Sequence, residues 1–149
     1  MDTLTPKQRH NNMAAILNKG TKPELLVRQW LWHHGYRYRL NVNNVPGKPD
    51  IVLRQYRTAI FVNGCFWHGH EGCSKYTIPK SNTDFWIAKV NRNKERDQRN
   101  YNDLNNAGWH VIVIWECQLS SKLIETTMRN VEHALNGQIL RLYNHKMSP

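Results

Sequence analysis

The stretch AIFVNGCFWHGHEGC, residues 59–73, joins an apolar strand to a loop that is rich in metal-ligating side chains. Its first four residues, Ala59-Ile60-Phe61-Val62, are typical of a short buried strand. The loop that follows contains three glycines, two histidines, two cysteines and the aromatic pair Phe66-Trp67. Zinc prefers thiolate and imidazole ligands, and glycine lets a backbone turn tightly around an ion. The stretch therefore predicts a metal-stabilised loop that displays aromatic side chains.

The cysteine pattern favours a metal site over disulfide bonds. The chain has three cysteines, Cys65, Cys73 and Cys117, and an odd number with a polar N-terminus indicates a reducing interior. Cys117 follows an apolar strand expected at 111–115, which could return it to the loop. Three thiolates and one imidazole would form a closed tetrahedral zinc site, and the spacing allows either His68 or His70 as the fourth ligand. The alternative for Cys117 is a small buried apolar residue.

Composition predicts one domain with a polyanionic partner. The chain has 149 residues, a length that can bury a substantial core, and a formal net charge of +10. Such a charge favours binding to nucleic acid, and six tryptophans supply rings that could stack on bases. No apolar run approaches the roughly 20 residues of a membrane-spanning helix.

Local signals predict the element order ααβββαβα, an α/β domain with a small mixed central sheet flanked by helices. Capping boxes at Thr5 and Thr21 begin two helices. The first is expected to end near Leu17. The second is expected to bury Leu25, Leu26, Trp30 and Leu31 and to end at Gly35. The remaining elements are strands at 36–42, 50–53 and 58–62, a helix at 83–107, a strand at 110–115 and a helix at 121–136. The second and third strands should form a hairpin, and the strand–helix–strand unit should be a parallel crossover.

Asp50 and the basic helix at 83–107 are candidates for phosphodiester chemistry. A carboxylate at a strand end can hold Mg²⁺, which needs only one or two protein oxygens, although Asp50 taken alone would more often be a turn or strand-edge residue. The helix carries Lys89, Arg92, Lys94, Arg96 and Arg99, which suit either DNA-backbone contacts or a solvated face.

A set of motifs in this chain resembles the very short patch repair (Vsr) endonucleases. The motifs are GKPD at 47–50, FVNGCFWH at 61–68, TDFW at 83–86, NKERD at 93–97, GW at 108–109 and VIWEC at 113–117. The resemblance covers residues 9–117, within a single domain of 1–149, and the segment 121–149 matches no motif. It implies a restriction-endonuclease-like fold of the PD-(D/E)xK type. It also implies nicking of one DNA strand beside a T·G mismatch that arises from deaminated 5-methylcytosine.

Carried over position by position, the resemblance assigns roles to individual residues. Asp50 and the main-chain carbonyl of Val62 would bind catalytic Mg²⁺, with the acidic Glu24 nearby, and His68 would be the general base. Structural zinc would be held by Cys65, His70, Cys73 and Cys117. Phe66, Trp67 and Trp86 would wedge beside the mismatch, and Asn12 and Met13 would approach DNA from the minor groove. We also expect Lys89, Asn93 and Arg96 to contact DNA.

The sequence departs from the family pattern at three places. Val62 replaces a threonine, so a carbonyl ligand survives but a hydroxyl does not. Asn63 stands where a histidine assists catalysis, and an amide cannot relay a proton. The Cys65–Cys73 loop is one residue longer.

Two other functions stay open. One is a restriction-fold nuclease of different sequence specificity, and the other, because Asn63 weakens the inferred active site, is a catalytically weak zinc-containing DNA-binding module. Zinc hydrolase chemistry is disfavoured, because a site with three thiolates is closed to substrate. The resemblance further implies a monomer of the bacterial cytoplasm that is linked in function to a cytosine-5 DNA methyltransferase.

Overall fold

A computed structural model of the chain describes residues 21–147. The expected helix at 5–17, with Asn12 and Met13, lies outside these residues. The described helices and strands are α2 (Lys22–His33), β1 (Arg39–Leu40), β2 (Ile51–Leu53), β3 (Thr58–Asn63), α3 (Thr83–Asn106), β4 (His110–Trp115) and α4 (Ile124–Met147). Two short 3-10 helices, η1 (Arg54–Tyr56) and η2 (Glu116–Leu119), follow β2 and β4. No helix among the described residues is long and apolar enough to span a membrane.

The four strands form one mixed sheet in the order β1-β2-β3-β4. β2 and β3 pair antiparallel, with Ile51 opposite Ile60, so the expected hairpin is confirmed. β3 and β4 pair in parallel from Thr58 opposite His110 to Asn63 opposite Trp115, with α3 as the connection between them. β2 ends its pairing at Ile51, whereas β3 continues to Asn63, so the end of β3 projects beyond β2.

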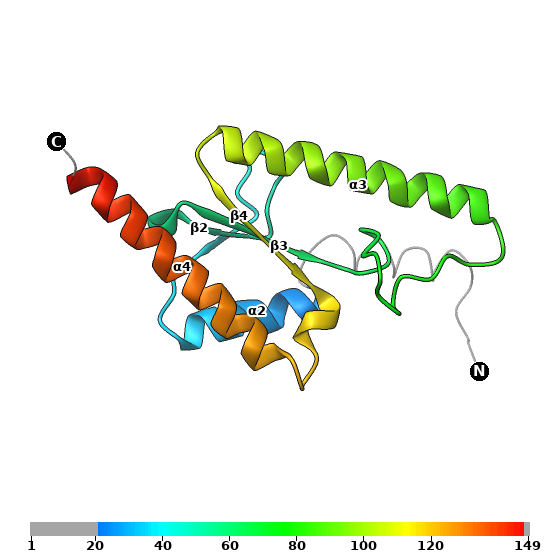
Figure 1. The fold of residues 1–149 in the computed structure, drawn as a ribbon, viewed down its shortest axis with the longest axis horizontal. Helices are drawn as coiled ribbons and strands as arrows, with labels where there is room; N and C mark the ends of the chain where they lie inside the picture. Colours follow the sequence, from blue (N-terminus) through cyan, green and yellow to red (C-terminus); the bar gives the residue numbers. More distant parts are fainter. Residues whose placement is uncertain (1–20, 148–149) are drawn as a thin grey trace.

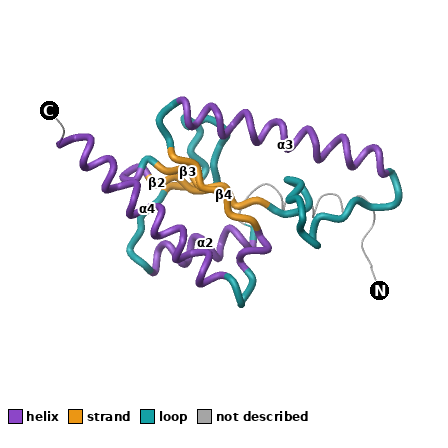
Figure 2. Tube along the Cα trace, viewed as in Figure 1, coloured by secondary structure: helices purple, strands orange, loops and turns teal. Residues whose placement is uncertain are grey.

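Helices cover both faces of this sheet (Figures 1 and 2). α3 lies along one face, and α2 and α4 lie together on the other. The larger core joins α2 and α4 to the sheet through Val27, Leu31, Ile60, Ile114 and Met128. A smaller core forms on the α3 side, where Leu104 packs with Val45, Ala59 and Phe61. The protein is therefore a three-layer α/β domain with the sheet in the middle.

The predicted helix boundaries agree with the structure at α2 and α3. Thr21 caps α2, because its Oγ1 accepts a hydrogen bond from the Glu24 amide at 3.4 Å, and Gly35 follows the helix with a positive φ of 85°. Gly108 ends α3 in the same way, with φ 89°. One of the four residues expected on the buried face of α2 is exposed. Leu25 is 39% exposed, and the fully buried apolar side chains are Val27 and Leu31.

Two predicted boundaries are wrong. The strand expected at 36–42 is reduced to Arg39–Leu40, because the Tyr36 amide bonds to the Leu31 carbonyl at the end of α2 and Asn41 turns the chain with φ 53°. The final helix does not end at Asn136 but continues to Met147. Asn136-Gly137 commonly ends a helix. Here α4 continues because its later turns, with Ile139 and Leu142, lie against the η1 turn.

Candidate active site and metal centre

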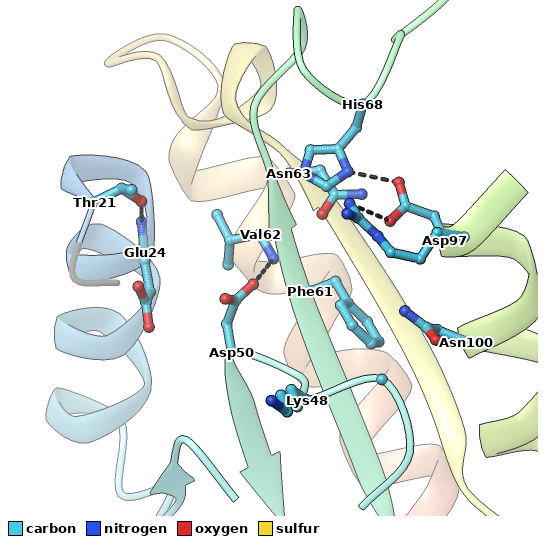
Figure 3. A pocket seen from close by; sticks show the side chains of 12 residues that line it. Thr21, Glu24, Lys48, Asp50, Phe61, Val62, Asn63, His68, Asp97 and Asn100 are labelled. Atoms are coloured by element: carbon cyan, nitrogen blue, oxygen red, sulfur yellow. Dashed lines mark hydrogen bonds and ion pairs between the residues drawn. The ribbon is translucent and has the colours of Figure 1, made fainter. Parts of the chain in front are cut away.

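A cavity of about 550 Å³ opens where β3 projects beyond β2, between α2 and α3. Its lining is polar and mixed in charge, and comes from every layer of the fold (Figure 3). The lining residues are Thr21, Glu24, Gly47, Lys48, Asp50, Phe61, Val62, Asn63, His68, Arg96, Asp97 and Asn100. Glu24, Asp50, Val62, Asn63, His68 and Arg96 were expected at the site from the sequence. The fold thus gathers these six residues around one space.

Asp50 is a carboxylate of this cavity whose pKa is raised. Its Oδ2 accepts a hydrogen bond from the Val62 amide at 2.7 Å. The pKa of Asp50 is raised to about 6, chiefly by burial and to a smaller degree by the nearby Glu24 charge, while the Val62 hydrogen bond and His68 act in the opposite direction. Glu24 is itself buried, on the first turn of α2, and faces Asp50 across the cavity. Two carboxylates held close in a partly desolvated space form an environment that favours a cation.

The donor set at Asp50 fits Mg²⁺. The N–H and C=O groups of one strand residue point to the same edge of the strand, so the Val62 carbonyl is directed to the side where its amide meets Asp50. Among residues 21–147, no strand pairs with Val62 on that side, because β2 begins at Ile51, opposite Ile60. Asp50 retains a second carboxylate oxygen. Carboxylate and carbonyl oxygens suffice for an ion that keeps most of its waters.

His68 forms a close pair with Asp97 of α3. Its Nδ1 lies 2.6 Å from Asp97 Oδ2, and Arg96 lies 3.6 Å from the other oxygen of the same carboxylate. With Nδ1 donating to Asp97, Nε2 of the neutral ring is the acceptor, which is the arrangement that a general base requires. Sequence reasoning assigned no role to Asp97, although the NKERD motif at 93–97 contains it. The available signal was its helical spacing of four residues from Asn93 within NKERD.

The loop after β3 is tightly wound, and its two histidines lie in two different sites. The His68 amide bonds to the Gly64 carbonyl at 3.2 Å, and the His70 amide bonds to the Cys65 carbonyl at 2.9 Å. Gly69 between them has φ 63°, and a Cβ there would lie 2.8 Å from Val90 Cγ1 on α3. Only glycine fits this close approach. His68 therefore faces the cavity while His70 lies in a second cluster.

That second cluster contains the expected zinc ligands. The ligand atoms of Cys65, His70, Cys73 and Cys117 all lie within 4.8 Å of one another. Cys117 Sγ is 3.4 Å from His70 Nδ1. A tetrahedral zinc with bonds of about 2.3 Å to sulfur and about 2.0 Å to nitrogen places such atoms about 3.5 Å apart. The His70 ring stacks on Trp115 at 4.1 Å, which fixes its orientation. The cluster fits zinc, and His68 is not part of it.

The residues predicted to wedge into DNA form one aromatic cluster, in which Phe66 and Trp67 come from the loop after β3 and Trp86 comes from α3. Phe66, Trp67 and Trp86 meet pairwise at ring-centroid distances of 5.2, 5.7 and 5.8 Å. All three are half-buried, and the neighbouring Phe85 is 55% exposed. The Lys89 ammonium lies 6.0 Å from the Trp67 ring centroid. Asn93, expected to contact DNA, donates its side-chain amide to the Trp67 carbonyl at 2.8 Å and so also holds the loop.

Lys48 and Asn100 also line the cavity and were not singled out from the sequence. Gly47 brings the chain before Asp50 against α3: a Cβ at this position would meet Asn100 Cβ at 2.7 Å, and its φ is 77°. Lys48 follows with φ 48°, which is uncommon for a residue with a side chain. The GKPD motif at 47–50 is the signal that could have identified Lys48.

Fold and site together define a basic α/β protein in which two carboxylates, Asp50 before a strand and Glu24 on a helix, line the same cavity as the His68–Asp97 pair. Residues 1–75 match the family model described as DNA mismatch endonuclease Vsr. The chain is 51% identical to the type II nicking enzyme V.NmeAIP of Neisseria meningitidis serogroup A, over 83% of this chain and 87% of that protein. It is 44% identical to the type II nicking enzyme V.XorIIP of Xanthomonas oryzae pv. oryzae, over 87% and 96%. It is 39% identical to the DNA mismatch endonuclease Vsr of Escherichia coli (strain K12), over 76% and 72%.

The chain belongs to the Vsr DNA mismatch endonuclease family. It is a DNA nicking endonuclease, and DNA is its substrate.

Proposed function

We propose that this enzyme nicks one DNA strand beside a T·G mismatch, with Mg²⁺ as catalytic ion and zinc as structural ion. The mismatch would arise by deamination of 5-methylcytosine, which links the enzyme in function to a cytosine-5 DNA methyltransferase. The proposal includes a restriction-endonuclease-like fold, supported by a mixed sheet whose second strand begins directly after the candidate metal ligand Asp50. It further places the protein on bacterial DNA as a cytoplasmic monomer.

The observation that carries this proposal is the adjacency of Trp67 and His68. Trp67 belongs to the aromatic cluster, and the next residue faces the cavity and pairs with Asp97. A ring inserted beside a base pair would therefore set the position of the backbone relative to the imidazole. Unstacking costs least where pairing is already weak, so a mismatch would be preferred over a paired step.

In the proposed mechanism, different cavity residues bind the metal ion and accept the proton. Asp50, the Val62 carbonyl and Glu24 would hold hydrated Mg²⁺, which when bound polarises the phosphate and stabilises charge on the leaving oxygen. His68 Nε2 would take a proton from the attacking water, while Asp97 holds Nδ1–H and stabilises the imidazolium. The new bond forms between the water oxygen and phosphorus, and the bond from phosphorus to the leaving oxygen breaks.

A strand-specific nicking assay tests this function. Duplexes carrying T·G, C·G or T·A at one position, in varied flanking sequences, are incubated with the protein and Mg²⁺, and each strand carries a different label. We expect a nick in the strand that contains the mismatched thymine, and none without Mg²⁺. Equal cutting of the paired duplexes would contradict mismatch specificity.

A second candidate keeps the reaction and changes the specificity. The two relatives at 51% and 44% identity are named type II nicking enzymes, whereas the relative named DNA mismatch endonuclease Vsr is 39% identical. This pattern favours a recognition sequence around the nick that differs from that of the relative named Vsr. The varied flanks in the same assay separate the two cases, because a context-restricted enzyme cuts T·G in one flank and not in others.

A further inference from the structure

Asn63 is the last residue of β3 and is held by a residue of α3. Its side chain lines the cavity but is only 3% exposed. Its Nδ2 donates a hydrogen bond to the Tyr101 hydroxyl at 2.9 Å. The Tyr101 hydroxyl holds this buried amide, because rotation of the side chain away from its partner would leave a buried polar group unsatisfied. With Nδ2 on the hydroxyl, Oδ1 is the end of the Asn63 amide that points away from Tyr101.

This contact is the third in a series along one face of α3. Asn93, Asp97 and Tyr101 are spaced four residues apart, so they lie on successive turns of the same helical face. Asn93 holds the Trp67 carbonyl, Asp97 holds His68 and Tyr101 holds Asn63. The first two contacts fix the residues proposed for the wedge and the base. The third contact fixes a position next to them, and none of the roles assigned above explains it.

An amide held in this way can orient water but cannot transfer its proton. With Nδ2 bonded to Tyr101, the other end of the amide, Oδ1, is the acceptor left for the cavity. The Asn63 amide and the His68 ring line the same cavity, and Figure 3 draws both at the end of the cavity near Asp97. Two acceptors that flank one position, a ring nitrogen and an amide oxygen, fix both hydrogens of a water molecule. Such fixed orientation accelerates attack because the reacting atoms are already aligned.

We propose that Tyr101 is a positioning residue of the nicking reaction. Its hydroxyl holds Asn63 so that Oδ1 accepts one hydrogen of the attacking water while His68 Nε2 takes the other. This inference rests on the proposed role of His68. It assigns the proton transfer to His68 alone and gives Asn63 a purely orienting part.

The ring and the hydroxyl of Tyr101 have different partners, so their roles can be tested separately. Burial raises the pKa of Tyr101 to about 12, so the hydroxyl keeps its proton at neutral pH. The ring packs edge-on against Phe61 at a centroid distance of 5.1 Å. Phenylalanine at position 101 therefore retains the packing and removes only the partner of Asn63.

Four proteins test the inference: the wild type, Tyr101→Phe, Asn63→Ala and the double variant. Single-turnover nicking of T·G duplex is measured at saturating enzyme across a pH series, together with the Kd for DNA. We expect Tyr101→Phe to lower the rate about 10-fold with the Kd unchanged, because one orienting hydrogen bond is lost. Asn63→Ala should lower the rate by at least as much, and the double variant should lose nothing further. The pH of half-maximal rate should not move in any variant, since neither side chain titrates in that range.

Tyr36→Phe is the matched control. Tyr36 is a buried tyrosine whose hydroxyl also bonds to an asparagine, Asn136, at 3.0 Å, but far from the cavity. It should lower the melting temperature and leave nicking unchanged. If Tyr101→Phe does the same, or if its effect adds fully to that of Asn63→Ala, the contact is structural only and the inference is wrong.

Two further readouts separate this inference from the proposed function. If the wild type cuts another duplex in place of T·G, the same four proteins are compared on that duplex, and mismatch specificity fails without the inference failing. If His68→Ala nicks at the wild-type rate, the role of His68 and this inference fail together. A crystal structure of Tyr101→Phe should show the Asn63 amide rotated. An unchanged amide would overturn the inference whatever the substrate.

Discussion

His68 Nδ1 lies 2.6 Å from Asp97 Oδ2, so a residue of the loop after β3 is held by a carboxylate on the long helix α3. Both side chains are largely buried, at 23% and 14% exposure, so solvent does not screen the pair strongly. The contact orients the imidazole and leaves Nε2 for the substrate side.

Asp97→Asn should lower the nicking rate by about 100-fold, the lower end of what a well-placed acid–base group contributes. The amide can accept from Nδ1–H but carries no charge to stabilise the imidazolium. DNA binding should be retained, as measured by fluorescence anisotropy. Asp103→Asn, an exposed aspartate on the same helix, is the control and should be silent. A rate near that of the wild type in Asp97→Asn would show that the Asp97 carboxylate has no part in the mechanism.

Asp50→Asn should abolish nicking and increase stability above about pH 6. Burial raises the pKa of Asp50 from 3.8 to about 6, so between these values the folded protein holds the proton more tightly than the unfolded chain. The free energy of unfolding therefore falls as pH rises through this window, and asparagine avoids that loss. We expect a gain of about 2 kcal/mol at about pH 8 and little below about pH 4.

Urea unfolding at several pH values measures this gain, and Asp103→Asn again serves as control. Mg²⁺ should stabilise the wild type and not Asp50→Asn, because an ion that binds only the folded state adds to its stability. Equal stabilisation of both proteins by Mg²⁺ would place the ion elsewhere.

His70→Ala should lose zinc, whereas His68→Ala should keep it and lose nicking. The two histidines are two residues apart, but only His70 lies in the cluster with the three cysteines. Zinc content by elemental analysis, expected at about one per chain in the wild type, decides between them. Cys73→Ser should lose zinc and unfold at lower temperature, because binding of a structural metal contributes folding free energy. Zinc loss in His68→Ala would mean that the two roles are exchanged.

Trp67→Ala or Trp86→Ala should weaken binding to T·G duplex more than to paired duplex. The expected difference is about 1–3 kcal/mol, the scale of stacking between a base and an aromatic ring. Trp32→Ala is the control, since Trp32 is 53% exposed on α2, outside the aromatic cluster. A large fall in melting temperature with equal loss on both duplexes would show that the cluster serves as core rather than as wedge.

Much of the fold was predictable because its signals are local. Thr21 and Gly35 bound α2, Gly108 ends α3, and the apolar runs on either side of Arg57 form the hairpin as expected. The prediction was wrong where distant packing overrides a local signal. The strand at 36–42 is shortened because Tyr36 is bound to the end of α2, and α4 passes Asn136 because its later turns rest on η1.

The amino-acid sequence by itself determined the chemistry available to this protein: thiolates and imidazoles around a glycine-rich turn, a carboxylate before a strand and a basic helix. It left open which histidine joins the cysteines. The tertiary structure decided that, because Gly69 packs against α3 and turns His68 and His70 apart. It also decided that Asp97 holds His68 and Tyr101 holds Asn63, across 29 and 38 residues of chain. Such pairings follow from how a helix lies on a sheet, and this depends on packing between distant segments rather than on the local order of residues.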